Sequence, residues 1–151
     1  MKRKILPAFL ATLLAAIHGF GAEGTTVKNW NTIQTYDVAA LKREMGAQVR
    51  RVVGVKCYFR GKDIHHMKPN WYEGTLWGPD ASGKKGFAAV KVMVAKKDLP
   101  AFKALTTNAS SAEMLTAYGD VQRDSDSNFM FVRLLGTKAD PNGEGGATLS
   151  W

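Results

Sequence analysis

The sequence predicts a mainly β fold, a barrel of five strands with one helix between the third and fourth strands. Segments 48–61 and 87–94 are rich in valine and alternate apolar with polar residues, with the period of two that marks a half-buried strand. A short segment with helical spacing, 98–105, follows directly behind the second of these. Two further strand-like segments, 114–123 and 129–138, are joined by a polar turn and form a predicted hairpin.

Length and cysteine content set the limits of the fold. A chain of 151 residues is long enough for one sizeable core but not comfortably for two, so we expect one domain. Cys57 is the only cysteine, so no internal disulfide can form. The domain must therefore be held together by burial of apolar side chains alone.

Residues 1–22 have the pattern of a secretory signal peptide. A basic segment, MKRK at 1–4, precedes an apolar segment, 5–17, that is too short to span a bilayer as a stable helix, and small residues surround a cleavage site near Ala22. We expect a periplasmic or secreted protein with no integral membrane segment after cleavage. An uncleaved N-terminal anchor is the alternative.

The net charge favours anionic partners. Removing the three basic residues of MKRK, one positive charge each, lowers the formal net charge from +8 to +5. A mildly basic protein of this kind suits nucleic acid, lipid headgroups or acidic polysaccharide, although such a charge also serves solubility.

Residues 23–45 are expected to form a lead-in segment followed by a short helix. The first part of this segment shows no clear period. Asp37 is placed to cap a helix whose apolar residues recur at helical spacing, and Gly46 is placed to end that helix.

Segment 48–61 predicts a long first strand with one buried face. The residues expected to face inward are Val49, Val53, Val55, Cys57 and Phe59. Gly54 lies inside this strand, where a missing side chain usually marks a bend, a bulge or a close approach. A first strand bent at a glycine can belong to two sheets at once.

The second and third strands follow the same reasoning. Segment 62–70 is broken by a proline and predicts a loop, 71–78 predicts a short second strand, and 79–86 has the Gly and Asp content of a hairpin connection. The third strand is 87–94, and Asp98 is placed to cap the helix behind it.

The end of the chain is rich in glycine and polar residues. Residues 139–151 are therefore expected to form a flexible tail. The predicted organisation is a signal peptide at 1–22, a lead-in segment and helix at 23–45, a barrel at 46–138, and this tail.

The order strand, strand, strand, helix, strand, strand over 46–138 resembles the OB-fold, a five-stranded Greek-key barrel. The likeness is carried by Gly54 in the first strand, by the helix DLPAFKAL at 98–105, and by AYGDVQRDSDSNFMFVRL at 117–134, which is similar to the last hairpin of many small bacterial OB domains. It is a likeness of architecture and implies no particular activity. An SH3-like barrel and a mixed α+β sandwich are the alternative architectures.

The resemblance implies a place for a ligand. OB-fold proteins commonly bind across the outer face of the second and third strands, between two flanking loops. The strand alternation then gives as candidate ligand-binding residues Lys56, Tyr58, Arg60, Trp71, Trp77, Phe87 and Lys91. Aromatic rings beside Lys and Arg offer the flat apolar surface and the positive charge that suit an unstacked base or a sugar ring. The alternative is that Trp71 and Trp77 pack beneath the N-terminal helix or the tail.

Other chemistries find little support in the sequence. Asp63 and His65 are residue types that bind zinc or copper and face the same way in an extended chain, whereas the adjacent His66 points oppositely. No second cluster completes a four-ligand site, so we expect no metal and no cofactor. Cys57 could act as a nucleophile beside one of these histidines, but its place among the inward residues argues for a buried, inert thiol. No acyl-transfer serine motif, phosphate-binding glycine loop or zinc helix occurs, and we identify no catalytic residue.

The sequence thus favours an exported, non-enzymatic binding module that uses the outer face of its barrel. A protein, an oligosaccharide or a single-stranded nucleic acid is the expected partner. A small hydrolase and a structural subunit of an envelope assembly, which would add the edge of its sheet to a neighbour, are the alternatives.

Overall fold

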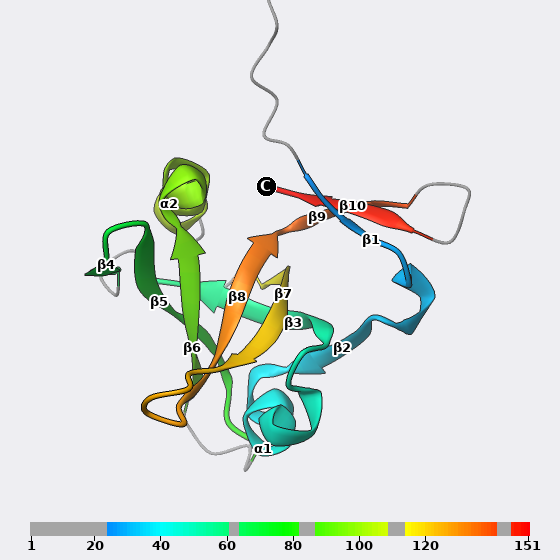
Figure 1. Ribbon diagram of the computed structural model, residues 1–151, viewed down its shortest axis with the longest axis horizontal. Helices are drawn as coiled ribbons and strands as arrows, with labels where there is room; N and C mark the ends of the chain where they lie inside the picture. The colour runs from blue at the N-terminus through cyan, green and yellow to red at the C-terminus, as the bar shows by residue number, and fades with distance from the viewer. Residues whose placement is uncertain (1–23, 61–63, 82–86, 109–113, 142–145) are drawn as a thin grey trace, which may run out of the picture.

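The strands of the computed structural model form two sheets, with one helix at each end of the larger one (Figure 1). The described residues are 24–60, 64–81, 87–108, 114–141 and 146–151. Within these ranges, no helix combines the length and the apolar character needed to cross a membrane. The expected signal peptide, 1–22, lies outside the described residues and stays a prediction.

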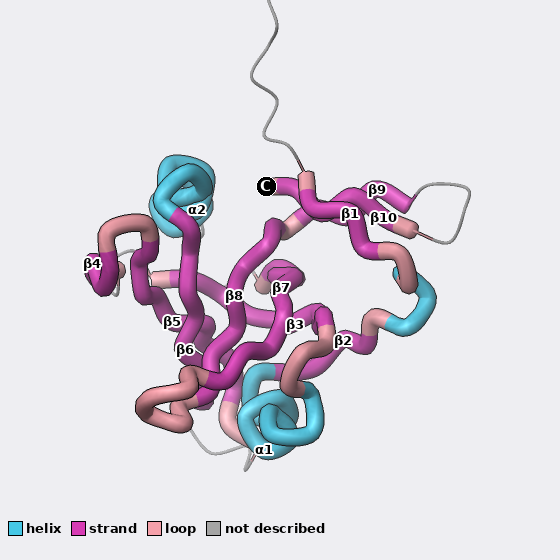
Figure 2. Tube along the Cα trace, viewed as in Figure 1, coloured by secondary structure: helices cyan, strands magenta, loops and turns pink. Residues whose placement is uncertain are grey.

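In the described residues the elements follow one another as strands with two helices and two short 3-10 turns inserted (Figure 2). In chain order they are β1 (Thr25–Val27), η1 (Trp30–Thr32), β2 (Gln34–Asp37), α1 (Val38–Gln48), β3 (Val52–Phe59), β4 (His65–Lys68), β5 (Trp71–Pro79), β6 (Phe87–Ala95), η3 (Lys96–Asp98), α2 (Leu99–Asn108), β7 (Leu115–Arg123), β8 (Met130–Gly136), β9 (Lys138–Pro141) and β10 (Ala147–Ser150). The small sheet has the order β1-β10-β9, and the large sheet has the order β2-β3-β7-β8-β6-β5-β4.

Five strands of the large sheet close into a barrel because β3 changes partners along its length. Residues Val52–Cys57 pair with β7, whereas Tyr58 and Phe59 pair with β5. Antiparallel pairing continues from β5 to β6 and from β7 to β8, and a parallel pair between Val92 and Val132 joins β6 to β8. The helix α2 connects the third barrel strand, β6, to the fourth, β7. This is the OB arrangement, and the predicted fold class is confirmed.

The barrel interior is filled by the residues that the alternation predicts. The inward residues of β3 and β6 are at most 3% exposed, except Ala88 at 7%: Val53, Val55, Cys57, Phe59, Ala88, Val90, Val92 and Val94. Leu76 of β5 and Phe102 of α2 complete this core, and the Phe59 and Phe102 rings meet edge to face with centroids 4.8 Å apart. Each fully buried side chain of this size contributes about 1.5–3 kcal/mol, so burial stabilises the fold without a disulfide.

Helix α1 begins where the sequence predicts but ends later. It starts directly after Asp37, although the Asp37 side chain makes no capping hydrogen bond. The prediction that Gly46 ends the helix is wrong, since α1 continues to Gln48. The left-handed residue that follows the helix is Arg50, with a φ of 69°, which is the role that glycine usually takes.

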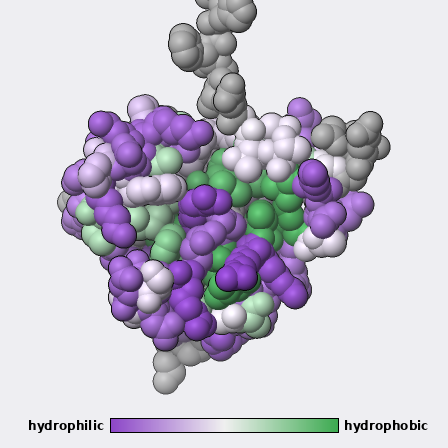
Figure 3. Space-filling view, viewed as in Figure 1, coloured by the Kyte–Doolittle hydropathy of each residue, from purple (hydrophilic) through white to green (hydrophobic). Residues whose placement is uncertain are grey.

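The two ends of the chain are ordered against each other, which local sequence did not show. β2 pairs in parallel with β3, and β1 pairs with β10 in the small sheet. The expectation that 139–151 lacks regular structure is wrong for its described residues, because β9 and β10 pair and Ala147 and Leu149 are fully buried. Figure 3 shows apolar atoms gathered between the small sheet and the barrel. Long-range pairing supplies the hydrogen bonds that these short segments could not make alone.

The predicted loop 62–70 also contains a strand. Its described part includes β4, which pairs with β5 through His65 and Glu73, His66 and Tyr72, and Lys68 and Trp71, with a register shift in between. The proline that argued against a strand, Pro69, lies just beyond its end. β4 therefore extends the sheet beside the first part of β5.

Helix α1 packs closely on β5 because Gly78 has no side chain. A Cβ atom at Gly78 would lie 2.9 Å from both the Cβ and the Cγ2 of Val38, which is fully buried. A Cβ atom at Gly46, on the same helix, would meet nothing within 4 Å.

We predict opposite effects of alanine at these two glycines. Gly78→Ala forces Val38 away from β5 and should lower the free energy of unfolding by about 1–3 kcal/mol. Gly46→Ala removes backbone freedom from a helix interior and should raise the free energy of unfolding by about 0.5–1 kcal/mol. Urea denaturation measures both, and equal shifts of the same sign would contradict this packing of α1.

Candidate ligand-binding face

Four of the predicted ligand-binding residues come together at one end of the outer barrel face. The guanidinium carbon of Arg60 lies 4.6 Å from the ring centroid of Trp77, 4.9 Å from that of Phe87 and 5.9 Å from that of Tyr58. The pairing of β3 with β5 sets Tyr58 opposite Trp77, and Phe87 meets Tyr58 edge to face at 6.2 Å. We call Tyr58, Arg60, Trp77 and Phe87 the arginine-aromatic cluster.

This cluster is part packing and part open surface. Tyr58 is only 6% exposed although it faces outward, because Arg60 and Phe87 cover it. Phe87 is 60% exposed, which is unusual for so large an apolar side chain. A cation over exposed rings is stabilised by about 0.5–1 kcal/mol per contact, so Arg60 is held in place while one ring remains available.

Trp71 lies at the other end of β5, apart from Trp77. The two residues are six positions apart along the strand, which is about 20 Å at 3.3–3.4 Å per residue. Trp71 borders a hollow of about 240 Å³ on the outer face. Its lining consists of Lys68, Trp71, Met93, Gln122, Phe131 and Arg133, which we call the Trp71 hollow.

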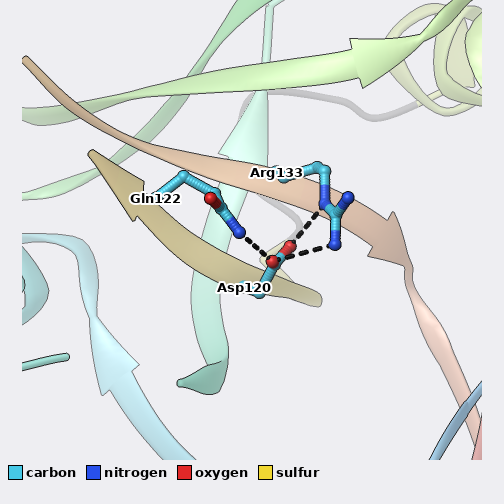
Figure 4. Close-up of polar contacts among 3 residues, drawn as sticks. All are labelled: Asp120, Gln122 and Arg133. Carbon is cyan, nitrogen blue, oxygen red and sulfur yellow. Dashed lines mark hydrogen bonds and ion pairs between the residues drawn. The ribbon is translucent and has the colours of Figure 1, made fainter. Parts of the chain in front are cut away.

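An ion pair fixes the cationic side of this hollow. Arg133 Nε and Nη2 donate to the two carboxylate oxygens of Asp120 at 2.8 and 3.0 Å, and the amide nitrogen of Gln122 donates to the same carboxylate (Figure 4). Asp120 is 8% exposed, so its charge would be costly without these partners. The Arg133 side chain remains 45% exposed, with its Nη1 group outside these hydrogen bonds.

The two remaining predicted residues, Lys91 and Lys56, lie in different places. The ammonium of Lys91 donates to the Glu73 carboxylate, so its charge is balanced on the face itself. Lys56 is exposed but lies between Asp37 of β2 and Thr116 of β7 in the strand register, away from β5. The structure thus brings together the arginine-aromatic cluster, places Trp71 at the far end of the same strand, and sets Lys56 apart.

Sequence reasoning missed most of the Trp71 hollow. Phe131 and Arg133 alternate with the inward Val132 and Leu134 of β8, a signal that was present in the sequence. Their neighbour across the sheet is Met93 of β6, which pairs with Arg133 through the parallel contact between β6 and β8. That contact joins strands far apart in the sequence, so periodicity alone does not show it.

The loop that flanks the hollow is internally braced. The Asp124 carboxylate accepts hydrogen bonds of 2.9 Å from the backbone N–H groups of Asp126 and Ser127. These hydrogen bonds, mainly that from Ser127, hold the pKa of Asp124 below its ordinary value, and the nearby Lys68 lowers it slightly further. The adjoining Phe129 is 48% exposed, so the loop presents an apolar ring beside the hollow.

The other candidate chemistries do not assemble in the described part of the chain. His65 and His66 are exposed on β4, where the His66 ring meets that of Tyr72 at 5.2 Å, and Asp63 lies outside the described residues. Across the described ranges, no group of three or more His, Cys, Asp and Glu side chains could hold a metal ion. Cys57 is fully buried, and its burial raises the pKa of the thiol to about 12.

Comparison with known proteins gives no family for this chain and one weak structural likeness. No protein-family model matches the chain, and no curated protein matches it. A crystal structure from Klebsiella pneumoniae, described as that of a candidate nucleic acid-binding lipoprotein, is similar at a TM-score of 0.40 with 18% sequence identity, over 68% of this chain and 89% of that one. The OB assignment rests on the order and direction of the barrel strands given above.

The buried thiol gives a pH-dependent prediction. Because the pKa of Cys57 is about 12 in the folded protein, the thiol stays protonated from pH 7 to 9 and should not react with iodoacetamide over that range. In the urea-unfolded chain the rate should rise with pH, since the free thiol then has a pKa near ~8.5. Rapid alkylation of the native protein, followed by mass spectrometry, would contradict the burial of Cys57.

Proposed function

We propose that this protein is a non-enzymatic binding module whose ligand is a single-stranded nucleic acid lying along the outer face of β5 and β6. The observation that carries the proposal is a row of two groups of rings and cations, one at each end of β5. It starts at the Trp71 hollow and ends at the arginine-aromatic cluster.

The dimensions of this row fit an extended polymer better than a compact ligand. Its two ends are about 20 Å apart along the strand, and OB folds engage roughly 4–16 nucleotides. The hollow itself, about 240 Å³, is smaller than the ~300–1,000 Å³ of a typical small-molecule pocket. A nucleic-acid strand that places one base in the Trp71 hollow and another on Phe87 would use both ends of the row.

The chemistry of the two ends suits bases and phosphates. Trp71 and Phe131 border the hollow as flat apolar walls on which a base can stack, and Lys68 and Arg133 supply positive charge beside them. At the other end, Phe87 offers an exposed ring next to the Arg60 guanidinium. Stacking on rings with nearby cations is the sequence-tolerant way in which proteins hold single strands.

The acidic groups of the face favour nucleic acid over an oligosaccharide. A neutral sugar is commonly held by carboxylates that accept hydrogen bonds from its hydroxyl groups. Here Glu73 is paired with Lys91 and Asp120 with Arg133 and Gln122, so their acceptor capacity is largely used. An oligosaccharide and a protein partner are the other outcomes of the experiments below.

The absence of enzymatic activity is part of the proposal. A hydrolase would need a nucleophile or a general base that is hydrogen-bonded and oriented within a pocket. In the part of the chain that the structure describes, neither His65 nor His66 makes a hydrogen bond to a carboxylate, and Cys57 is sealed in the core.

Loss of the stacking rings should weaken binding without loss of the fold. We expect Trp71→Ala or Phe131→Ala to raise the Kd for a fluorescent 12-nucleotide single strand by about 5- to 150-fold, because one stacked base is worth ~1–3 kcal/mol. Trp30→Ala is the matched control, since Trp30 packs on Tyr118 with centroids 5.8 Å apart, away from β5. Fluorescence anisotropy measures the Kd, and circular dichroism reports the fold.

Salt dependence and competition separate the possible ligands. With about three phosphates contacted by Lys68, Arg133 and Arg60, log K should fall against log salt concentration with a slope of about −2. Failure of every oligonucleotide to bind at 20–50 mM salt, a range well below ~150 mM physiological ionic strength, would refute the nucleic-acid proposal. Saturable binding of an acidic oligosaccharide that needs the same rings would then assign the face to glycans.

We further propose that the protein acts outside the cytoplasm, on the strength of the basic and apolar segments at 1–17. Expression of the full chain in a Gram-negative bacterium should give a mature protein that begins within about two residues of Glu23, in the periplasmic or secreted fraction. Intact mass and N-terminal sequencing measure this. Retention of 1–22 on membrane-bound protein would favour an N-terminal anchor instead.

A further inference from the structure

A cavity that shares no lining residue with the Trp71 hollow carries an independent inference. Figure 1 shows η1 and β2 at the right of the view and β4 and β5 at the left. Between the η1 segment and the connection from α1 to β3 lies a cavity of about 500 Å³. Its lining is Val27, Lys28, Asn29, Thr32, Ile33, Gln34, Gln48, Arg50, Arg51, Val52 and Val53, and we call it the α1–β3 cavity.

The charged groups that line this cavity all have the same sign. Lys28, Arg50 and Arg51 contribute three cations, and among the described residues no carboxylate lines the cavity. None of the three side chains makes an ion pair within the described residues. Concentrated positive charge without a protein partner is unfavourable unless solvent or an anion balances it.

Neutral amides add directed hydrogen-bonding groups. The Tyr36 hydroxyl donates to Gln34 Oε1 at 2.6 Å, so the other end of that amide, Nε2, has two N–H groups to offer. Gln48 is only 8% exposed, and its side chain makes no hydrogen bond to any residue in the described ranges. The Gln48 amide is nevertheless not sealed from solvent, because Trp151 Nε1 is the one buried unpaired side-chain N or O atom in the described residues, so water or a ligand can take its hydrogen bonds.

The backbone holds both arginines in fixed positions. Arg50 has a φ of 69°, which is uncommon for a residue other than glycine, asparagine or aspartate. Its N–H donates to Val121 O at 2.8 Å, and the N–H of Val121 in turn donates to Arg51 O at 2.9 Å. These hydrogen bonds to β7 hold the backbone of Arg50 and Arg51, whose side chains are exposed at the cavity.

The end of helix α1 does not account for this charge. Gln48 is the last residue of α1, and the C-terminus of a helix carries about half an elementary negative charge, which cations stabilise. Three cations exceed that partial charge several times over. The helix end therefore offsets only part of this positive charge, and the three side chains are exposed to solvent.

We propose that the α1–β3 cavity binds a small organic anion that carries a phosphoryl or sulfuryl group. Lys28, Arg50 and Arg51 would hold the oxyanion, and Gln34 and Gln48 would hydrogen-bond the polar body. The volume lies within the range of about 300–1,000 Å³ found for small-molecule sites, and it exceeds what an isolated phosphate would fill. This site is separate from the face along β5 and stands whether or not that face binds nucleic acid.

Isothermal titration calorimetry at low ionic strength, with ribose 5-phosphate, ribose, inorganic phosphate and inorganic sulfate as probes, tests the proposal. We expect ribose 5-phosphate to bind at a 1:1 ratio and more tightly than inorganic phosphate, and ribose not to bind. Phosphate and sulfate that bind equally would assign the site to tetrahedral dianions in general, and a preference for phosphate would assign it to phosphoryl groups. No saturable binding of any of these anions would overturn the proposal.

Four variants separate a built site from bulk charge. Arg50→Asn keeps a residue that tolerates the left-handed conformation, and both it and Lys28→Gln should weaken ribose 5-phosphate binding at least tenfold. Gln48→Leu changes no charge and should weaken binding as well. Lys42→Gln, on the exposed side of α1 and outside the cavity, is the matched control and should leave the Kd unchanged. Equal losses in Lys42→Gln and Lys28→Gln would show general electrostatic attraction and refute the site.

The phosphate of a nucleic-acid strand is the other source of the same chemistry. If the strand reached around the barrel to this cavity, ribose 5-phosphate would compete with a bound oligonucleotide, and Arg50→Asn would weaken oligonucleotide binding. We expect neither effect, because the α1–β3 cavity and the Trp71 hollow share no lining residue. Competition between the two ligands would overturn the proposal of a separate small-molecule site.

Discussion

The exchange of partners along β3 is the constraint on which the rest of the structure depends. Backbone groups of a strand must be paired or solvated, and β3 satisfies its own by pairing with β7 up to Cys57 and with β5 from Tyr58 onward. This step closes the sheet and removes its edges at that point. It also determines the outer surface, because Tyr58 comes to lie opposite Trp77 only where the partner has changed.

The segments outside the barrel pack on apolar surface that the closed barrel leaves exposed. Helix α1 covers the barrel where Gly78 allows Val38 to approach β5. At the other end, the ring of Trp151 meets that of Phe102 edge to face with centroids 6.0 Å apart. The last residue therefore packs against helix α2. Burial raises the pKa of the neighbouring Asp98, with Lys97 and the Trp151 side chain opposing the shift. The segment 24–37 and the described C-terminal residues are thus part of the fold.

Sequence predicted those features that depend on neighbouring residues and missed those that depend on distant ones. The inward residues of β3, such as Val55 and Cys57, and the helix behind β6 followed from local period. β1, β2 and β10 are too short to show a period, and their pairing joins the two ends of the chain. On the outer face, the alternation gives Lys91 as a candidate ligand-binding residue, whereas its ion pair with Glu73 depends on the register of β5 and β6.

The distribution of paired and unpaired charge gives each surface of the molecule a distinct role. On the face along β5 and β6, the carboxylates of Glu73 and Asp120 each have a cationic partner. In the proposed binding mode, aromatic rings would therefore position the ligand, and the exposed cations would add electrostatic attraction. In the α1–β3 cavity the balance is reversed, because the cations have no acidic partner in the lining and no aromatic ring is present there. A surface organised by rings selects ligands by planarity, whereas one organised by unpaired cations and amides selects them by charge and hydrogen bonding. The two proposed sites would therefore use different side chains of the same barrel.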